Sequence, residues 1–366
     1  MLKPRSPEQH EFSHVVDFLN THLRADSTWP INSEYPTALT LSNIHNMSII
    51  TDDEDQQKIL SHALIKPIVT KTPNAIYKIG AIGSVVTDPS FRQQGLSTLN
   101  MQNCLAKATA QDCDLVVLWT DKYDFYQKFG FELAGSENTY VFEQPQKNMC
   151  ENIRIIKGAQ VDPQAILKLY SQHTVGSVRS LEDLSQFLKI PNSNIYTAWS
   201  NTNQLLAYAV DGKGADLQTF VHEWGGQVNA IVDLLSHMVK TEGKTYHLMV
   251  PRHATNLRKT LDGLNIYCHQ GFLGMIRIHN FEAIAHKVKK AFRAEGFDQI
   301  VLEKQHGQVV FGLATDLYTL DNETDLVKIL FGPANIEDMT FIKPETRKIL
   351  ATLLPLPLWV WGWDSI

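Results

Sequence analysis

The residues of this sequence that could carry out chemistry gather between positions 79 and 131. Gly80 and Gly83 lie in a strand-like run, where a glycine allows a ligand to approach the backbone closely. The run ends at Thr87, and a short turn then leads directly into a segment with helical periodicity. In that turn the sequence reads Arg92, Gln93, Gln94, Gly95, Leu96 and Ser97.

A turn of this kind has the properties of an anion site. The first amides of a helix have no partner inside the helix, and the positive end of the helix dipole lies beside them. A glycine-containing turn therefore leaves several N–H groups directed at one spot, which suits a pyrophosphate. The pattern Arg-x-x-Gly-x-Ser occurs often by chance, so its weight comes from the elements around it.

Those elements form a strand, helix, strand unit. We expect a strand over residues 76–86, a helix over 96–110 and a buried strand over 115–119, because Met101 and Cys104 share one helical face and the last run is continuously apolar. This order requires parallel pairing of the two strands across a helical crossover.

The remaining elements follow the same plan twice. In the first half we expect a helix at 6–24, strands at 44–50, 62–69, 131–133 and 139–142, and a short helix at 123–129. A polar linker at 143–152 precedes a second set, with helices at 163–172 and 228–239 and strands at 195–199, 205–210, 217–224 and 246–250. Tyr126, Gly130 and Phe131 recur as Tyr267, Gly271 and Phe272, which together with the element order indicates an internal duplication.

The chemistry-bearing segment resembles the Gcn5-related N-acetyltransferase (GNAT) superfamily. Val85 and Val86, followed by the turn that begins at Arg92, are similar to the coenzyme A motif of that family, with Ser97 where glycine or alanine is usual. The resemblance implies acetyl-CoA as acetyl donor, with backbone amides of residues 94–97 on the pyrophosphate and the Val85 strand edge on the pantetheine arm. The implied cofactor-binding residues are Val85, Val86, Arg92, Gln93, Gln94, Gly95, Leu96 and Ser97.

Residues 124–131 are similar to the second signature of the family, in which a tyrosine lies near the coenzyme A sulfur. The resemblance implies that Tyr126 is a catalytic acid that protonates the departing thiolate. A phenol has a pKa near 10, close to that of an alkyl thiol, so the transfer is nearly matched. The alternative is that Tyr126 only packs against Phe125 and Phe129.

The second half lacks the phosphate-binding pattern. At the corresponding place stand His222, Glu223 and Trp224 before the glycines, with no arginine or glutamine at the motif spacing. We therefore expect a degenerate GNAT-like domain that walls the acceptor groove. Glu223 and His222 are candidates for polar groups on the acceptor side, and a strand-end pair satisfied by local backbone is the alternative.

Two GNAT-like halves followed by a smaller region also resemble the enhanced intracellular survival type of acetyltransferase. In that group the terminal carboxylate of the chain enters the active site, which makes Ile366 a candidate catalytic residue here. The aromatic ending with Trp359, Trp361 and Trp363 fits a buried terminus. Alternatively, it only closes the core of the last region.

The expected fold is α/β (α+β): tandem GNAT-like mixed sheets flanked by helices, with the second repeat degenerate and a small α+β C-terminal region. The expected domains are residues 1–147, which bind acetyl-CoA, residues 148–280, and residues 281–366 with the aromatic tail. The length of 366 residues exceeds what one core usually supports.

Composition argues against several classes of function. A net charge of −6 argues against a nucleic-acid binder, and no apolar run approaches the ~20 residues of a membrane span. The four cysteines form no CxxC pair, so we expect no metal and a reducing cytoplasm. The oligomeric state stays open, with a homo-oligomer among the alternatives.

The expected function is N-acetyl transfer by direct attack of an amine in a ternary complex, with a small cationic amine as acceptor. Two alternatives are a protein or peptide N-acetyltransferase and a non-catalytic coenzyme A sensor or scaffold. The sequence does not identify the base that takes the ammonium proton. Glu223, His222, a water chain and the Ile366 carboxylate all stay open.

Overall fold

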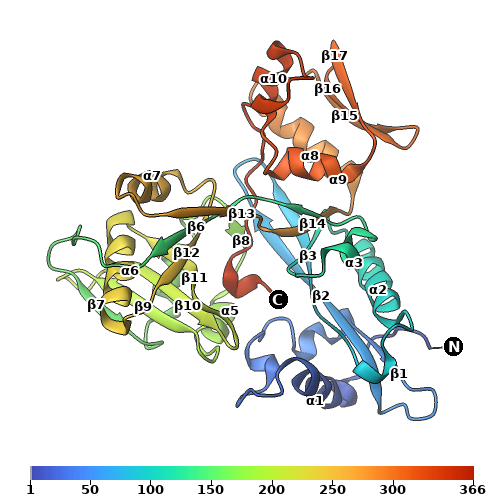
Figure 1. Ribbon diagram of the computed structural model, residues 1–366, viewed down its shortest axis with the longest axis horizontal. Helices are drawn as coiled ribbons and strands as arrows, with labels where there is room; N and C mark the ends of the chain where they lie inside the picture. The colour runs from blue at the N-terminus through green and yellow to red at the C-terminus, as the bar shows by residue number, and fades with distance from the viewer. Residues whose placement is uncertain (1) are drawn as a thin grey trace.

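A computed structural model describes residues 2–366 and contains two seven-stranded sheets and one three-stranded sheet, with helices packed against them (Figure 1). The predicted fold class, mixed sheets flanked by helices with a small α+β region at the end, is confirmed. No helix among these residues has the length and apolar content needed to cross a membrane.

The first half provides the elements around the chemistry-bearing turn. Its helices and strands are α1 (Phe12–Leu23), β1 (Met47–Thr51), β2 (Ile59–Lys71), β3 (Ile76–Thr87), α2 (Leu96–Ala110), β4 (Leu115–Leu118), α3 (Tyr123–Gln127), β5 (Glu132–Ala134) and β6 (Glu137–Phe142). Helix α2 begins directly after Gly95 and buries Met101, Cys104 and Ala108 in one core cluster. Strands β3 and β4 are parallel, as the crossover requires.

The second half repeats this order. Its elements are β7 (Arg154–Lys157), α4 (Pro163–Tyr170), β8 (Gly176–Ser177), α5 (Leu181–Phe187), β9 (Asn194–Trp199), β10 (Leu205–Lys213), β11 (Asp216–Gly226), α6 (Val228–Glu242), β12 (Tyr246–Pro251), α7 (Thr255–Gly263), β13 (Cys268–Gly271) and β14 (Gly274–Ile278). Here too the strands on either side of the crossover helix, β11 and β12, pair in parallel.

The two large sheets exchange one strand each. Strand β14 lies between β4 and β5 in the first sheet, and β6 lies between β12 and β13 in the second. The exchange is reciprocal, because each transferred strand occupies the same position relative to its neighbours. The domain limits at residues 147 and 280 stay predictions. Both β6 and β14 pair with strands on the other side of the limit at residue 147.

The last region contains α8 (Phe281–Ala294), β15 (Ile300–Gln305), β16 (Gln308–Leu313), β17 (Asp316–Leu320), α9 (Glu323–Phe331) and α10 (Pro344–Leu350). After α10 the chain leaves this region and runs back to the centre of the molecule, where its end lies between the two large sheets (Figure 1).

Two local predictions were wrong. The strand expected at 44–50 begins only at Met47, because Leu41–Asn46 is a 3-10 helix. The sequence echo is also not a structural equivalent: Tyr126 lies in α3 and is 8% exposed, whereas Tyr267 follows α7 and is 69% exposed. The duplication is therefore visible in the order of the elements and not in this short motif.

Candidate active site

A β-bulge shapes the backbone of β3 near Val85. On β2 only Ala63 lies between His62 and Leu64, whereas two residues, Ser84 and Val85, lie between their partners on β3. Ser84 adopts a left-handed backbone conformation, with φ of 50°. Residues of this bulge lie next to the predicted pantetheine-binding edge.

His62 holds the peptide group of the bulge in one orientation. Its Nδ1–H donates to the carbonyl oxygen of Ser84 at 2.8 Å. In a trans peptide the C=O and the following N–H point in opposite directions. The N–H of Val85 is therefore directed away from His62. Strand β3 pairs with β4 only over Ile79–Ala81, so beyond that point the two strands do not bond to each other.

The predicted phosphate-binding turn has free donors. Gly95 is the N-cap of α2 with φ of 78°, and a β-carbon added there would meet no atom within 4 Å. Among the described residues, none accepts from the amides of Leu96, Ser97 and Thr98. These residues line a hollow together with Thr87 and Phe125 at the start of α2. Free amides at a helix start suit an anionic group such as the diphosphate of coenzyme A.

The hydroxyl of Ser97, the departure from the family motif, is used inside the protein. Its Oγ lies 2.7 Å from Thr87 Oγ1, which in turn lies 2.8 Å from Ser61 Oγ. Asn100 of α2 donates to the same Ser61 hydroxyl at 2.9 Å. Ser97 therefore helps to attach α2 to the ends of β2 and β3.

Tyr126 belongs to a buried apolar cluster with Cys104 and Leu118, and Val85 packs against this cluster. The ring of Tyr126 contacts Phe125 edge-on, with centroids 4.9 Å apart, and its hydroxyl has no hydrogen bond to any described residue. Burial, helped by Asp121 and Cys104, raises the pKa of Tyr126 to about 12. The phenol is therefore protonated at neutral pH and has a free proton to donate. Its pKa lies above the value near 10 that we expected from sequence, so it is a weaker acid toward a thiolate than predicted.

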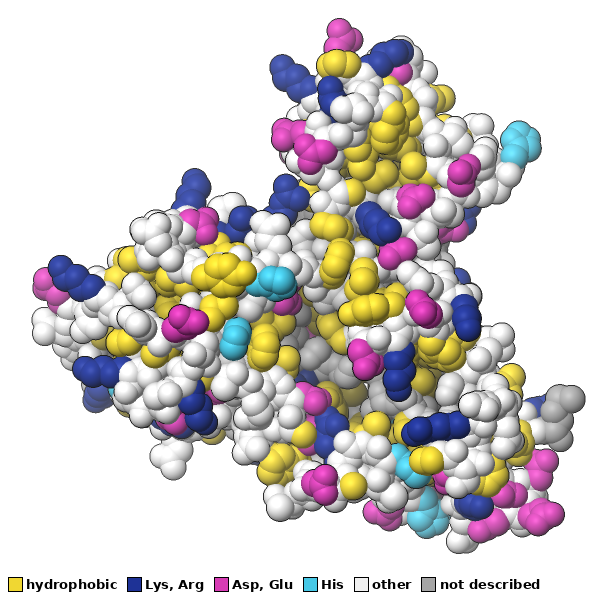
Figure 2. All heavy atoms as spheres, viewed as in Figure 1, with side chains coloured by type: hydrophobic (Ala, Val, Ile, Leu, Met, Phe, Trp, Pro, Cys, Tyr) yellow, Lys and Arg dark blue, Asp and Glu magenta, His cyan; other side chains and the backbone are white. Residues whose placement is uncertain are grey.

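A hollow of about 270 Å³ lies between the two halves and the end of the chain, and we call it the central hollow. Figure 2 shows a depression at the centre of this face of the molecule. Aromatic rings of Tyr35, Trp119 and Trp359 line the central hollow, with the polar residues Glu137, Lys213, Asp216, His222 and Ser365.

Ile366 reaches the central hollow and contacts β3 at the glycine that the sequence marked. A β-carbon on Gly83 would lie 2.8 Å from the main-chain carbon of Ile366, so only glycine leaves room for this contact. Strand β3 thus runs from Ile366 at Gly83, through the bulge, to the phosphate-binding turn at Thr87. This is a span of about 13 Å for four residues.

The aromatic tail docks on the second half rather than in the core of the last region. Trp361 packs on His173, with ring centroids 4.1 Å apart, and its indole N–H donates to Val175 at 3.1 Å. Trp363 stacks between Phe187 and Tyr208, with centroids 5.6 and 6.4 Å away. The tail is therefore held in the groove between the two halves.

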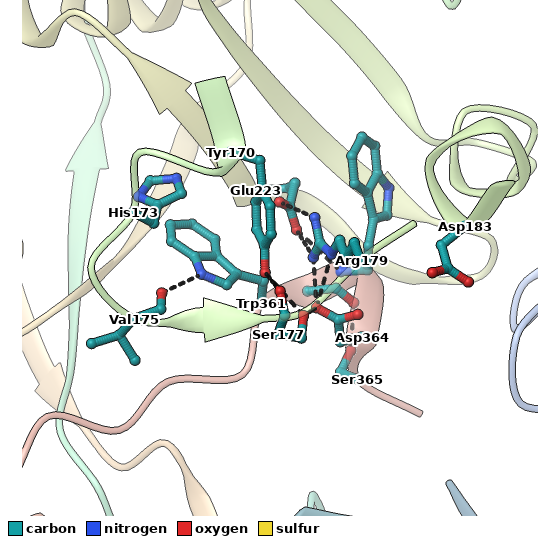
Figure 3. Close-up of polar contacts among 12 residues, drawn as sticks. Tyr170, His173, Val175, Ser177, Arg179, Asp183, Glu223, Trp361, Asp364 and Ser365 are labelled. Atoms are coloured by element: carbon teal, nitrogen blue, oxygen red, sulfur yellow. Dashed lines mark hydrogen bonds and ion pairs between the residues drawn. The ribbon is translucent and has the colours of Figure 1, made fainter. Parts of the chain in front are cut away.

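A buried ion cluster fastens the same tail (Figure 3). Arg179 donates to both carboxylate oxygens of Glu223, at 2.8 and 3.0 Å, and to Asp364 of the tail at 2.7 Å. Its guanidinium also lies 3.8 Å from the ring centroid of Tyr170. Burial opposes the charge of Arg179, but the attraction of Asp364 and Glu223 outweighs it and keeps the pKa of Arg179 well above its usual value.

Lys213 forms a second anchor. Its buried Nζ donates to the carbonyl oxygens of Gly362, Trp363 and Ser365 at 2.9, 3.2 and 2.5 Å. An ammonium group has three hydrogens, which matches these three acceptors. Burial, partly offset by Asp364, lowers the pKa of Lys213 to about 7.

The structure gives the two acceptor-side candidates of the second half different surroundings. Glu223 is fully buried, and both of its carboxylate oxygens accept hydrogen bonds from Arg179. It does not line the central hollow, so its geometry argues against a catalytic role. His222 lines the hollow and donates through Nε2 to Gly212 at 3.0 Å, while Nδ1 packs against Gly362 without a partner. Burial lowers the pKa of His222 to about 3, which makes it a weak base.

Sequence reasoning missed Glu137, His62, Arg179 and Lys213. Glu137 begins the exchanged strand β6 and lines the central hollow. In the sequence the one signal for Glu137 was weak: it is a carboxylate that stands shortly before the strand expected at 139–142. The other three residues gain their roles from contacts with distant parts of the chain. Within residues 2–366, no group of three or more His, Cys, Asp or Glu side chains is placed to hold a metal ion.

The chain is similar to known proteins in one family domain and in its fold. Residues 5–134 match the family described as "Acetyltransferase (GNAT) domain". A solved GCN5-related N-acetyltransferase from Anabaena variabilis superposes with a TM-score of 0.69 at 14% identity, and both chains are covered completely. Eis1 from Mycobacterium abscessus gives a TM-score of 0.63 at 10% identity, again with full coverage of both chains.

A protein from Enterococcus faecalis described as a probable N-acyltransferase has a TM-score of 0.66 at 13% identity over the full length of both chains. At these identities the likeness concerns the fold. A search of curated protein sequences finds no match.

Proposed function

We propose that this chain, whose residues 5–134 match a GNAT acetyltransferase domain, transfers the acetyl group of acetyl-CoA to a small cationic amine by direct attack in a ternary complex. One observation carries the proposal. Strand β3 ends at the predicted phosphate-binding turn, contains the bulge, and contacts Ile366 of the central hollow at Gly83. Its residue Val85 packs against the apolar cluster that contains Tyr126.

The donor side rests on the free amides at the start of α2. Leu96, Ser97 and Thr98 would hold the pyrophosphate, and the edge of β3 near Val85 and Val86 would bond the pantetheine arm. Arg92 is exposed beside the turn and supplies a positive charge there. The second half has no equivalent turn, so we propose one acetyl-CoA per chain.

The acceptor side rests on the character of the central hollow. Three aromatic side chains line it, and an ammonium group, Lys213 Nζ, already lies 4.9 Å from the ring centroid of Tyr35. Its carboxylates also attract a cation. Asp216 is already paired, since Arg24 donates to it at 2.6 Å and Tyr35 at 2.5 Å. Glu137 has no such ion pair. The small volume and the tail that bounds it favour a small amine over a polypeptide acceptor.

In the proposed reaction the neutral amine attacks the thioester carbonyl carbon. The N–H of Val85 would stabilise the developing oxyanion, because the His62–Ser84 hydrogen bond directs it away from His62. Tyr126 then protonates the thiolate that leaves. Holding donor and acceptor on one strand supplies the proximity that such a transfer needs.

The test is a thiol-release assay with acetyl-CoA against polyamines, aminoglycosides, amino acids and peptides. We expect release above the no-acceptor rate for one or more small cationic amines. Release only with peptides would identify the peptide acetyltransferase alternative. Tight acetyl-CoA binding with no release for any amine would identify the coenzyme A sensor instead.

A further inference from the structure

We propose that Glu137 is the general base of this enzyme, the residue that removes the proton from the acceptor ammonium. The proposal rests on the proposed acetyl transfer to an amine and names the residue that this reaction leaves open. Glu137 comes from β6, the strand that the first half contributes to the second sheet.

The position of Glu137 places it where an acceptor would bind. It lines the central hollow together with Ile366 and Trp119. Ile366 contacts β3 at Gly83, and Trp119 follows β4 directly, so the hollow opens beside the two strands that diverge beyond Ala81. Trp119 also donates its indole N–H to Leu273 at 2.8 Å, which closes this wall across the exchanged strands. A carboxylate here faces an amine that approaches the thioester from the hollow.

The carboxylate of Glu137 is free to accept a proton. Its one hydrogen-bond donor among the described residues is Thr139, whose Oγ1 lies 2.9 Å from Oε1. No described cation forms an ion pair with it. Other titratable or charged groups line the two hollows beside Glu137. Tyr35, Lys213, Asp216, His222 and the carboxylate of Ile366 lie on one side, and Arg252 and Arg258 lie on the other.

The environment also sets the basicity of Glu137. Burial raises its pKa to about 7, and the hydrogen bond from Thr139 acts in the opposite direction. A base is most effective when its pKa lies near the working pH. Glu223 is less suited to this role because Arg179 binds both of its carboxylate oxygens. His222 is a weak base because burial lowers its pKa to about 3.

The reaction balances with these groups. Glu137 takes one proton from the ammonium, and the amine lone pair forms the new C–N bond as the C–S bond breaks. Tyr126 gives its proton to the thiolate. The amide nitrogen, still protonated after attack, loses a second proton to the phenolate of Tyr126, which restores it, and Glu137 releases its proton to water. The net reaction is an ammonium and acetyl-CoA giving an N-acetyl amine, coenzyme A thiol and one proton.

The test measures kcat/KM for the best amine between pH 5.5 and 9 in the full chain. In the wild type, kcat/KM should fall on the acid side with an apparent pKa near 7. In Glu137→Gln, kcat/KM at pH 7 should drop by about 10²–10⁴-fold, the range of general-base contributions, and the limb near pH 7 should vanish. Acetyl-CoA affinity, measured by calorimetry, should stay within a few fold.

Two further variants separate chemistry from folding. Thr139→Val removes the hydrogen bond that stabilises the carboxylate, so the acid limb should move to higher pH. Glu132→Gln removes a carboxylate of β5 that lies 3.5 Å from Lys328 and should leave the pH profile unchanged. A folded Glu137→Gln protein with wild-type kcat/KM and an unaltered acid limb would overturn the proposal while leaving acetyl transfer itself intact. If the wild type releases no thiol with any amine, the proposed function itself is contradicted.

Discussion

The hydroxyl of Tyr126, which has no hydrogen bond to a described residue, leads to a prediction about the effect of removing it. Tyr126→Phe keeps the ring that packs on Phe125 and removes only the proton donor. We expect kcat to fall by about ten- to a thousandfold, because the thiolate would leave without a general acid. Acetyl-CoA affinity should change by no more than a few fold. Unchanged single-turnover rates in this variant would assign Tyr126 to packing.

Local sequence signals led to some candidate site residues and not to others. Gly95 and Tyr126 could be proposed from sequence because a glycine-containing turn before a helix and a short aromatic signature are features of neighbouring residues. Glu137, Arg179 and Lys213 were not, because their environments depend on burial by segments far away in the chain. The same limit explains Glu223, whose partner Arg179 lies 44 residues earlier.

At the scale of elements, the bulge of β3 depends on a side chain of β2. His62→Leu should lower kcat by about tenfold or more, because the Ser84 carbonyl would lose its donor and the Val85 N–H its orientation. His62→Asn places an amide N–H near the position of Nδ1–H and should recover most of the rate. The comparison is made by steady-state kinetics, with melting temperatures of both variants measured beside it. If His62→Leu and His62→Asn are equally stable and lose the same factor in kcat, the hydrogen bond to Ser84 is unimportant for the reaction.

The tail is the second element that we expect to affect activity. Deleting Ser365 and Ile366 removes one of the three carbonyls held by Lys213 and the residue that contacts Gly83. An α-carboxyl has a pKa near 3.5, so at Ile366 it would orient the amine rather than act as an efficient base. We therefore expect kcat/KM to fall more than the melting temperature does. A folded variant with wild-type kcat/KM would reduce the tail to a packing role.

The elements themselves were largely predictable because apolar periodicity is a local property. Helix α2 begins and ends as the spacing of Met101 and Cys104 indicated, and the parallel pairing of β3 and β4 followed from the crossover. The partners of β6 and β14 were not predictable, because short strands of similar composition pair equally well in either sheet. Their exchange became visible only in the three-dimensional arrangement.

At the scale of the whole molecule, the exchange makes the two halves depend on each other. A fragment of residues 1–147 would keep β6 without β12 and β13, and its own sheet would lack β14 between β4 and β5. We expect this fragment to be insoluble or to unfold without a cooperative transition, since β4 and β5 would leave unpaired edges. Circular dichroism with thermal melting provides the measurement. A cooperative transition in the fragment would show that the first sheet is stable without β14.

Co-expression of residues 1–147 with residues 148–366 extends that experiment. Each piece supplies the strand that the other lacks, so we expect the two to assemble and to release thiol from acetyl-CoA. Failure of the pair to assemble would mean that chain continuity through 143–152 is needed for the exchange.

The central claim is that one acetyl-CoA binds to the first half through the turn at Gly95, and calorimetry tests it most directly. The wild type should bind one acetyl-CoA per chain. Gly95→Asp should abolish binding, because it places a negative charge at the pyrophosphate site, whereas Gly95→Asn has nearly the same size, tolerates the left-handed backbone and should retain more affinity. Undiminished affinity in a folded Gly95→Asp protein, or two acetyl-CoA molecules per chain, would contradict the account.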